Sequence, residues 1–285
     1  MTLEEAEKIR EEAKPKAHNQ AFLDAVNGIM NDTINNRPNI ETKKPIISIV
    51  TIYDEENERL WLQKYLDNLP QLSSEQAGQI EVILCYCKPI GTPETKPSET
   101  VTRYGVQIST VHCYYEQWNF AEARNLAKEA AQGEWILSLD TDEYIIHNQI
   151  QKILDTVRIQ HENVGAIKTT IVSHHRDLDG VQIAEAVPSQ KRLFRNIPEL
   201  VWQCRVHETV EFSLHDLGYT VNDSAIVIMH EGYEVSDIVL KRKLSRNLDL
   251  AMKEYTYTKN QQIRDFCWFY VLQTSEQLIK YKDIK

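Results

Sequence analysis

Three carboxylates stand within four residues of one another near the middle of the chain. Asp140, Asp142 and Glu143 directly follow the apolar run 135–139. Carboxylates this close repel one another unless a positive charge lies between them. Mg²⁺ and Mn²⁺ prefer oxygen ligands, and either ion can hold a diphosphate and neutralise the charge that develops when a nucleotide departs. On a strand end, Asp140 and Asp142 would point the same way, so that one could reach a ribose or the metal while the other binds the metal; the alternative is a solvated turn.

Imidazole and guanidinium groups elsewhere in the chain complement this cluster. His230 follows an apolar run, and neutral imidazole is a common metal ligand, although a packed structural histidine would fit the same pattern. Arg192 and Arg195 stand three apart beside an aromatic residue, and their planar guanidinium groups suit phosphate. Arg124 lies in a helical stretch, where a diphosphate contact or an exposed salt bridge would explain it equally.

The elements that must position these residues alternate between strands and helices. Apolar, β-branched runs predict strands over 46–52, 79–87, 106–113 and 135–139, and amphipathic runs predict helices over 58–69 and 120–131. This order is typical of an α/β fold, a mostly parallel sheet flanked by helices. We expect Gly133 to end the second helix in a left-handed cap. The acidic cluster then falls at the carboxyl end of a strand, where open α/β sheets bind ligands.

The rest of the chain divides into a less regular half and two extensions. We expect a helix over 148–160 and strands over 164–173, 190–194 and 225–229. His174, His175, Asp177 and Asp179 resemble a second metal cluster, but the polar loop before Gly180 favours a hairpin turn. We predict an N-terminal helical extension and linker over 1–44, a catalytic domain over 45–235 and a C-terminal helical extension over 236–285.

Charge and composition restrict the class of protein. Asp and Glu number 42 against 32 Lys and Arg, and the net charge of -10 disfavours unspecific attraction to a polyanion such as DNA. No stretch approaches the roughly 18 apolar residues that a membrane span needs, and the charged start lacks an apolar signal core, so we expect a soluble, cytoplasmic protein. The cysteines lack paired C-x-x-C spacing and are expected to be reduced, packed thiols, with a metal or redox role as the alternative for Cys85 and Cys87.

Several segments in a fixed order resemble the family 2 glycosyltransferases. The run 118–125 (WNFAEARN), followed by 133–135 (GEW) and 140–143 (DTDE), is similar to that family's core signature, and 53–56 (YDEE) is similar to its first block. Further on, the chain resembles the branch that includes the bacteriocin-peptide glycosyltransferases; the segments are 191–195 (KRLFR), Trp202, 206–208 (VHE), 230–233 (HEGY) and 246–248 (RNL). The resemblance covers roughly residues 45 to 250.

This resemblance implies a GT-A fold, a nucleotide-sugar donor, with a UDP-sugar as the family default, and Mn²⁺ or Mg²⁺ as cofactor. The metal ligands it implies are Asp140, Asp142 and His230, and the donor-binding residues are Thr51, Tyr53, Glu55, Tyr86, Arg124, Asp140, Arg192 and Arg195. The chain departs from the family at Tyr86 and Cys87, where consecutive aspartates usually contact the base. Since an aromatic ring can stack on any base, we expect Tyr53 and Tyr86 to flank the base and to discriminate loosely.

The same resemblance places the catalytic base on the acceptor side. An inverting transfer needs one group to accept the acceptor's proton, and Glu208 is the expected base, across the donor pocket from the cation. His207 is expected to contact donor or acceptor, unless it is a core histidine. Glu143 is the rival carboxylate, but a neighbouring cation would lower its proton affinity.

The acceptor and the partners stay open at this level. A glycan, a peptide side chain or a modified nucleobase would each fit, and the last of these would make the chain a phage-type DNA glycosyltransferase. A catalytically silent nucleotide-sugar-binding or scaffolding protein is the alternative from another class, and metal-dependent hydrolysis of nucleotide sugars is a third. The aromatic C-terminal helices predict packing on the catalytic domain or on a second subunit, so a homo-oligomer is a further hypothesis.

Overall fold

The computed structural model describes most of the chain after residue 43. The described residues are 44–54, 66, 72–92, 100–103, 105–176, 182–231 and 237–282. The predicted N-terminal extension, apart from Lys44, and the predicted helix over 58–69, apart from Leu66, therefore lie outside them. Residues 43–285 form one compact unit, to which all of the following refers.

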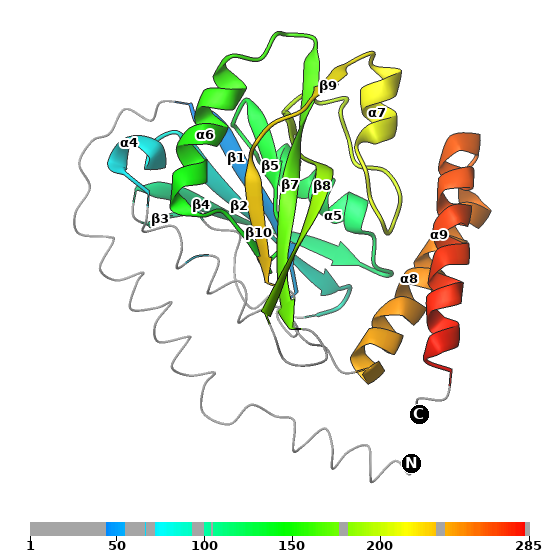
Figure 1. Ribbon diagram of the computed structural model, residues 1–285. Coiled ribbons are helices and arrows are strands. Elements are labelled where there is room, and N and C mark those ends of the chain that lie inside the picture. Colours follow the sequence, from blue (N-terminus) through cyan, green and yellow to red (C-terminus); the bar gives the residue numbers. More distant parts are fainter. Residues whose placement is uncertain are drawn as a thin grey trace. The chain divides into compact units, whose positions relative to one another are not determined.

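One mixed sheet, parallel at its centre, organises this unit (Figure 1). Its strand order is β3 (Thr100–Arg103), β4 (Val106–Tyr115), β2 (Ile80–Pro89), β1 (Ile47–Tyr53), β5 (Trp135–Ser138), β8 (Gln182–Arg195), β7 (Val164–Arg176), β10 (Val227–Glu231) and β6 (Glu143–Tyr144), with β9 (Thr220–Asn222) paired to β7. Strands β4, β2, β1 and β5 are parallel neighbours, β8 runs against them, and β7 and β10 run with them. Six carboxyl ends thus share one edge.

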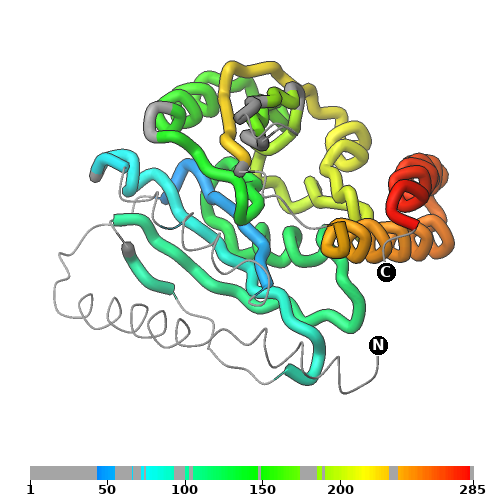
Figure 2. The backbone as a smooth tube through the Cα atoms, turned by 60° about the horizontal axis from the view of Figure 1, so that its bottom comes forward, coloured from blue at the N-terminus to red at the C-terminus, as the bar shows by residue number. Residues whose placement is uncertain are grey.

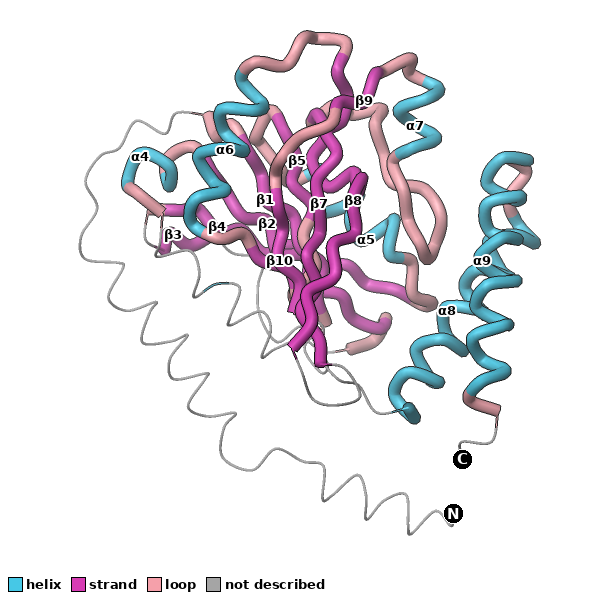
Figure 3. The backbone as a smooth tube through the Cα atoms, viewed as in Figure 1, coloured by secondary structure: helices cyan, strands magenta, loops and turns pink. Residues whose placement is uncertain are grey.

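Helices cover both faces of the sheet, because side chains of a strand point alternately to either side. Ile47 and Ile49 of β1 belong to a core shared with α6 (His147–Arg158), whereas Val50 and Ile52 belong to a core shared with α5 (Phe120–Glu129). Figure 3 shows the strands gathered between the helices. The predicted α/β class, with a mostly parallel sheet flanked by helices, is confirmed.

Gly133 connects α5 to β5 in a way that differs from the expected left-handed cap. It is not among the described residues with positive φ, and the cap of α5 is Ala130 in a right-handed conformation. Its N–H donates to Ser48 Oγ and to the buried Glu81 Oε1, at 2.8 and 3.0 Å. A Cβ atom here would lie 2.6 Å from the Ser48 backbone nitrogen. Close approach to β1, and not handedness, requires the glycine.

The segment that suggested a second metal cluster belongs to a long hairpin. Strands β7 and β8 pair antiparallel up to Arg176 and Gln182, which confirms the predicted hairpin arrangement. The turn with Asp177 and Asp179 lies outside the described residues.

The C-terminal extension is a helical hairpin, as predicted. Helix α8 (Asp237–Tyr257) and helix α9 (Gln261–Lys280) lie side by side, as the orange and red segments of Figure 2 show. Asn260 caps α9 by accepting hydrogen bonds from the N–H groups of Gln262 and Ile263. None of the described helices is both long and apolar enough to cross a bilayer.

Candidate functional site

Arg124 of α5 is the centre of a polar network beyond the carboxyl end of β5. Its side chain is 4% exposed and donates three hydrogen bonds: from Nη2 to Asp140 Oδ1 at 2.5 Å, from Nη1 to Ser138 Oγ at 2.9 Å, and from Nε to Glu208 Oε1 at 2.6 Å. The two carboxylates raise the pKa of Arg124 against the effect of burial. The alternative of an exposed salt bridge is therefore wrong.

Arg192 of β8 holds the acidic turn from the other side. Its Nη2 donates to Asp140 Oδ2 at 2.9 Å and to Glu143 Oε1 at 2.5 Å. Both oxygens of Asp140 are thus bound by arginines, which lower its pKa although burial opposes them. Both oxygens of Asp140 are therefore engaged with arginines, and the assignment of Asp140 as a metal ligand stays a prediction.

Asp142 and His230 face each other in the same region. Asp142 Oδ2 lies 3.2 Å from His230 Nε2, and His230 Nδ1 lies 2.9 Å from Ser173 Oγ on the neighbouring strand. If Nδ1 donates its hydrogen to Ser173, then Nε2 and Asp142 are both acceptors, and a cation or a proton must lie between them. A hydrogen bond that His230 donates to Asp142 raises the pKa of His230, and burial opposes this shift.

The spacing of this pair fits a divalent cation. Ligands at about 2.1 Å on adjacent octahedral positions lie about 3 Å apart, close to the observed separation of the two atoms. A metal-bound histidine usually gives its other ring N–H to an oxygen acceptor, and Ser173 occupies that place. Asp142 and His230 would therefore hold the ion.

A turn, and not the end of a strand, presents the two aspartates. Strand β5 ends at Ser138, and the chain turns through Thr141 and Asp142 before β6 pairs antiparallel with β10, with Glu143 opposite His230. The expectation that Asp140 and Asp142 point the same way is wrong, because the turn directs Asp140 to the arginines and Asp142 to His230.

Glu143 is a buried support of this turn. It is 2% exposed, its Oε2 accepts the N–H of Asp140 at 2.9 Å, and its Oε1 accepts from Arg192. Burial raises the pKa of Glu143 to about 7, although Arg192 opposes the shift. We had argued that a neighbouring cation would lower the proton affinity of Glu143, whereas its raised pKa would suit a base. Both of its carboxylate oxygens, however, are buried and accept hydrogen bonds within the turn, so they do not face an acceptor.

Glu208 and His207 lie on a short closed loop. Backbone hydrogen bonds of 2.9 and 3.0 Å between Gln203 and Thr209 close it, and Cys204 and His207 have left-handed backbones with φ of 75° and 55°. Such strain in residues other than glycine is often found at functional sites. Burial lowers the pKa of His207, with Glu208 opposing. We expected Glu208 to lie across the donor pocket from the cation. The structure places it closer to the acidic turn, because Arg124 contacts both Glu208 and Asp140.

The C-terminal hairpin packs on this loop. Val206 is buried against Leu250, Ala251 and Val271, and the His207 ring stacks on Tyr270 with centroids 3.8 Å apart and planes at 10°. Of the two alternatives for the aromatic helices, packing within the chain, on the loop that carries His207, is therefore observed. The hairpin supports the residues that we assigned to catalysis.

Arg195 does not belong to the site. In antiparallel β8, Leu193 pairs with Leu137 and Arg195 with Trp135, so Arg192 points toward the carboxyl edge of the sheet while Arg195 lies at the amino edge. There Arg195 donates to the carbonyls of Val164 and His161, and its guanidinium lies 4.7 Å from the centre of the Trp135 ring. The prediction that Arg195 contacts a phosphate is wrong, because Arg195 lies three residues beyond Arg192 along β8, at the edge of the sheet opposite the acidic turn.

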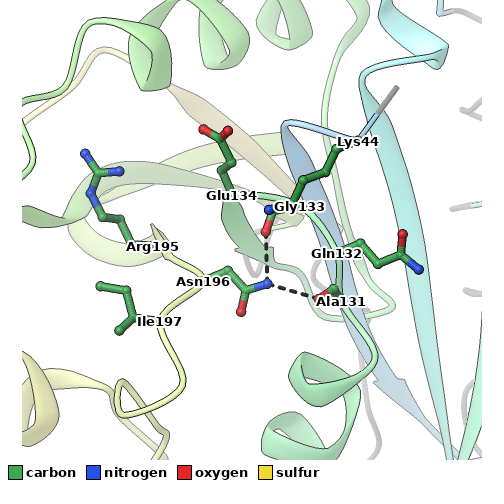
Figure 4. Close-up of a pocket in the computed structure, with 8 residues that line it drawn as sticks. All are labelled: Lys44, Ala131, Gln132, Gly133, Glu134, Arg195, Asn196 and Ile197. Atoms are coloured by element: carbon green, nitrogen blue, oxygen red, sulfur yellow. Dashed lines mark hydrogen bonds between the residues drawn. The ribbon is translucent and has the colours of Figure 1, made fainter. Parts of the chain in front are cut away.

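A cavity of about 570 Å³ opens at that amino edge (Figure 4). Its lining residues are Lys44, Ala131, Gln132, Gly133, Glu134, Arg195, Asn196 and Ile197. Asn196 Nδ2 donates to the carbonyls of Ala131 and Gly133 on its wall. The cavity therefore lies at the opposite end of β5 from the acidic turn.

The predicted base-binding residues are arranged differently from expectation. Tyr53 and Tyr86 are register partners on β1 and β2, and their rings stack on each other with centroids 5.2 Å apart. A base between them would need a spacing of about 7 Å, twice a carbon contact of about 3.5 Å, so they do not flank one here. Thr51 is fully buried, and Glu55 lies outside the described residues.

Three functional side chains were missed by the sequence analysis. Ser138 and Ser173 orient Arg124 and His230, and Tyr270 supports His207. Alternation along β5 could have pointed to Ser138, a polar residue in an otherwise apolar strand. Nothing in the sequence pairs Tyr270 with a residue 63 positions earlier.

Comparisons with known proteins show that parts of this chain are similar in sequence to two kinds of protein. No family model matches the chain. A TPR repeat-containing protein of Synechococcus elongatus is 33% identical over 121 residues, 40% of this chain and 28% of that protein. The SPbeta prophage-derived glycosyltransferase SunS of Bacillus subtilis is 26% identical over 157 residues, 54% of this chain and 35% of that protein. The chain thus spans about a third of the length of the curated relatives it matches.

Solved structures of glycosyltransferases align with low scores. S. aureus TarS 1-349 in complex with UDP-GlcNAc is 12% identical, with a TM-score of 0.45, over 80% of this chain and 72% of that one. Mannosyltransferase PcManGT from Pyrobaculum calidifontis in complex with GDP-Man and Mn²⁺ is 12% identical, with a TM-score of 0.46, over 93% of this chain and 86% of that one. In sequence, over about half of its length, the chain is similar to a glycosyltransferase.

Proposed function

We propose that this chain is a divalent-metal-dependent glycosyltransferase that transfers a sugar from a nucleotide-sugar donor. The observation that carries the proposal is the pairing of Asp142 Oδ2 with His230 Nε2 at 3.2 Å, next to the buried Arg124 and the partly buried Arg192. The sequence likeness to SunS over 157 residues supports the reaction class.

The metal and the arginines would act together on the leaving group. A bound Mn²⁺ or Mg²⁺ supplies charge stabilisation for the departing diphosphate. Arg192 Nη2 now divides its hydrogen bonds between Asp140 and Glu143, so it can turn one of them to a phosphate oxygen without leaving its strand. Arg124 keeps Asp140 and Glu208 in fixed positions throughout.

Glu208 is the base in this proposal. Among the described residues its hydrogen bond is the one from Arg124 to Oε1, so Oε2 is available to an acceptor hydroxyl or amide. The acceptor atom attacks the anomeric carbon, the bond to the diphosphate breaks, and the acceptor's proton passes to Glu208 Oε2. A single displacement of this kind inverts the anomeric configuration.

Binding of metal and donor tests this function. We expect nucleotide sugars to raise the melting temperature of the chain in Mn²⁺, since a ligand at 100 times its Kd adds about 2.7 kcal/mol to the free energy of unfolding. UDP-sugars are the first candidates. The variants Asp142→Asn and His230→Gln should lose the Mn²⁺-dependent part of this shift.

A surface pair of the same chemistry provides the matched control. His215 Nδ1 lies 3.3 Å from Asp216 Oδ1, with both side chains more than half exposed, and Asp216→Asn should leave the shift unchanged. Equal shifts in Asp142→Asn and wild type would refute the metal site. Release of free sugar without transfer, in product analysis with candidate acceptors, would show hydrolysis instead.

A further inference from the structure

Three cysteines converge in the core between the sheet and α5. Cys85 and Cys87 alternate along β2, so both side chains point to the same face, and Cys113 on β4 is the register partner of Cys87. All three are free thiols and are buried, with exposures of 0%, 2% and 5%. They belong to the apolar cluster that includes Ala121 and Ala123 of α5.

The three sulfur atoms lie close enough to share one ion. Every pair of Sγ atoms is within 4.8 Å. Three ligands at a metal–sulfur distance of about 2.3 Å lie about 3.8 to 4.0 Å from one another, so side-chain movements of less than about 1 Å would complete such a site. Within the described part of the chain, this is the one group of three or more His, Cys, Asp and Glu side chains that close together.

The three thiol groups favour a different kind of metal ion from the one that the carboxylates of the acidic turn favour. Thiolates are soft ligands and bind Cu⁺, Zn²⁺ or Cd²⁺, whereas carboxylate oxygen favours Mg²⁺ and Mn²⁺. We propose that Cys85, Cys87 and Cys113 form a three-thiolate site for a thiophilic metal ion, separate from the cation site at Asp142 and His230. On binding, each thiol releases its proton to solvent and forms one metal–sulfur bond.

The cost of burying charge limits the site to a tightly held ion. Three thiolates carry three negative charges, of which a divalent ion neutralises two. Arg124 acts electrostatically on Cys85 and supplies a positive charge nearby. Because Arg124 also pairs with Asp140 and Glu208, it offsets only part of the remaining negative charge.

A titration with Cd²⁺ tests the proposal. The full chain is reduced, freed of metal with a chelator, and titrated in excess Mg²⁺, which occupies oxygen sites. We expect an ultraviolet charge-transfer absorption from thiolate to metal that saturates at one Cd²⁺ per chain. Cys85→Ser, Cys87→Ser and Cys113→Ser should each weaken Cd²⁺ binding by about 100-fold or more, above the about 10- to 100-fold typical of losing an outer-shell partner.

A second pair of buried cysteines serves as the matched control. Cys204 and Cys267 pack together near α9 with exposures of 5% and 2%, and Cys204→Ser and Cys267→Ser should keep the full absorption. Thermal unfolding without metal verifies that each variant folds. Where a serine variant does not fold, Cys113→Ala replaces it, since alanine leaves the core apolar.

Three outcomes would overturn the proposal. These are no saturation at one equivalent, equal loss of absorption in the Cys204 and Cys267 variants, and a disulfide between two of Cys85, Cys87 and Cys113, detected by peptide mapping after unfolding without reductant. The proposal is independent of the transferase function. Asp142→Asn should lose Mn²⁺ binding and keep Cd²⁺ absorption, and Cys87→Ser should do the reverse.

Discussion

At the scale of single residues, one guanidinium group connects the two sides of the candidate site. Arg124 contacts Asp140 on the proposed donor side and Glu208 on the proposed acceptor side, and both contacts come from one buried, planar group. A bidentate fork fixes the relative position of two carboxylates in a way that a flexible ammonium group would not.

Replacing Arg124 should therefore destabilise the protein strongly. We expect Arg124→Gln to lower the free energy of unfolding by about 3 kcal/mol, because two partly buried carboxylates lose their counter-charge. Arg158→Gln is the control: this residue pairs with Asp155 on the surface, with side-chain exposures of 42% and 61%, and should cost less than about 1 kcal/mol. Urea denaturation measures both values, and similar losses would contradict a central role for Arg124.

The His230 pair predicts opposite pH dependences with and without metal. Asp142 raises the pKa of His230 above its ordinary value of 6.5. Without metal, the stability from this pair is fully present below pH 6.5 and is lost as pH rises through the raised pKa. Mn²⁺ needs neutral imidazole, so its stabilising effect should grow over the same range. Unfolding curves against pH, with His230→Gln as reference, test this; parallel curves would exclude it.

Glu208→Gln should separate chemistry from binding. The amide keeps the shape of the side chain but cannot accept a proton, so we expect turnover to fall by about two orders of magnitude while Mn²⁺ and donor binding persist. Glu211→Gln, an exposed neighbour paired with Lys191, should be nearly neutral. Kinetics and calorimetry of both variants decide the question. Near-normal turnover in Glu208→Gln would move the base elsewhere.

At the scale of elements, the connection from α5 to β5 fixes the start of β5 and thereby the position of Asp140, which follows that strand. Glu81 accepts hydrogen bonds from Ser48 Oγ and from the N–H groups of Gln132 and Gly133, so one buried carboxylate fastens this connection to β1 and β2. The fastening aligns the start of β5 with its neighbours.

Gly133→Ala should disturb this connection. The added Cβ would meet the backbone of Ile47 and Ser48 at 2.6 to 2.8 Å, and such overpacking costs about 1 to 3 kcal/mol. The exposed neighbour Gln132 uses only its backbone N–H, so Gln132→Ala should be neutral. Thermal unfolding compares the two. A stable Gly133→Ala variant would show that β1 can move away.

Sequence reasoning located the long elements and missed the short ones. Continuous apolar runs identify β1, β2, β4 and β5, whereas β3, β6, β9, α4 (Ser74–Ala77) and α7 (Glu211–Asp216) are too short to show a period.

The wrong prediction for Arg195 has a related cause. Spacing alone does not say which end of a strand faces the ligand edge, and β8 begins eight residues before its predicted start at Gln190.

The acidic turn shows where prediction from the sequence stops. The residue types predicted that Asp142 and His230 would share a cation, because carboxylate and imidazole groups are common metal ligands, and the structure places the two side chains 3.2 Å apart. The separate roles of Asp140 and Asp142 depend on a turn and on the pairing of β6 with β10, and both are decided by contacts between distant segments.

At the scale of the whole molecule, the two sides of the site come from different parts of the chain. The proposed donor side is built from α5, the turn after β5, β8 and β10, whereas the loop with His207 and Glu208 packs against α8 and α9. The loop also bonds to the start of α5, where Phe120 N–H donates to the Arg205 carbonyl at 2.9 Å.

Removing one aromatic ring from α9 should therefore reduce activity from a distance. Without the Tyr270 ring, His207 loses its stacking partner, and we expect Tyr270→Ala to lower kcat by about tenfold or more while Mn²⁺ and donor binding stay unchanged. Tyr257→Ala, at a ring that is 75% exposed on α8, is the control. Rescue by Tyr270→Phe would confirm that the ring face is required, whereas unchanged kcat in Tyr270→Ala would contradict it.

The stacking of His207 on Tyr270 also has a consequence for the timing of protein synthesis. A ribosome that has completed the sheet and both aspartates has not yet made the ring that supports His207. Under the proposed function, Asp142 and His230 would be present in the nascent chain before the ring that supports His207. We therefore expect full transfer activity only after α9 has emerged and packed on the loop with Glu208.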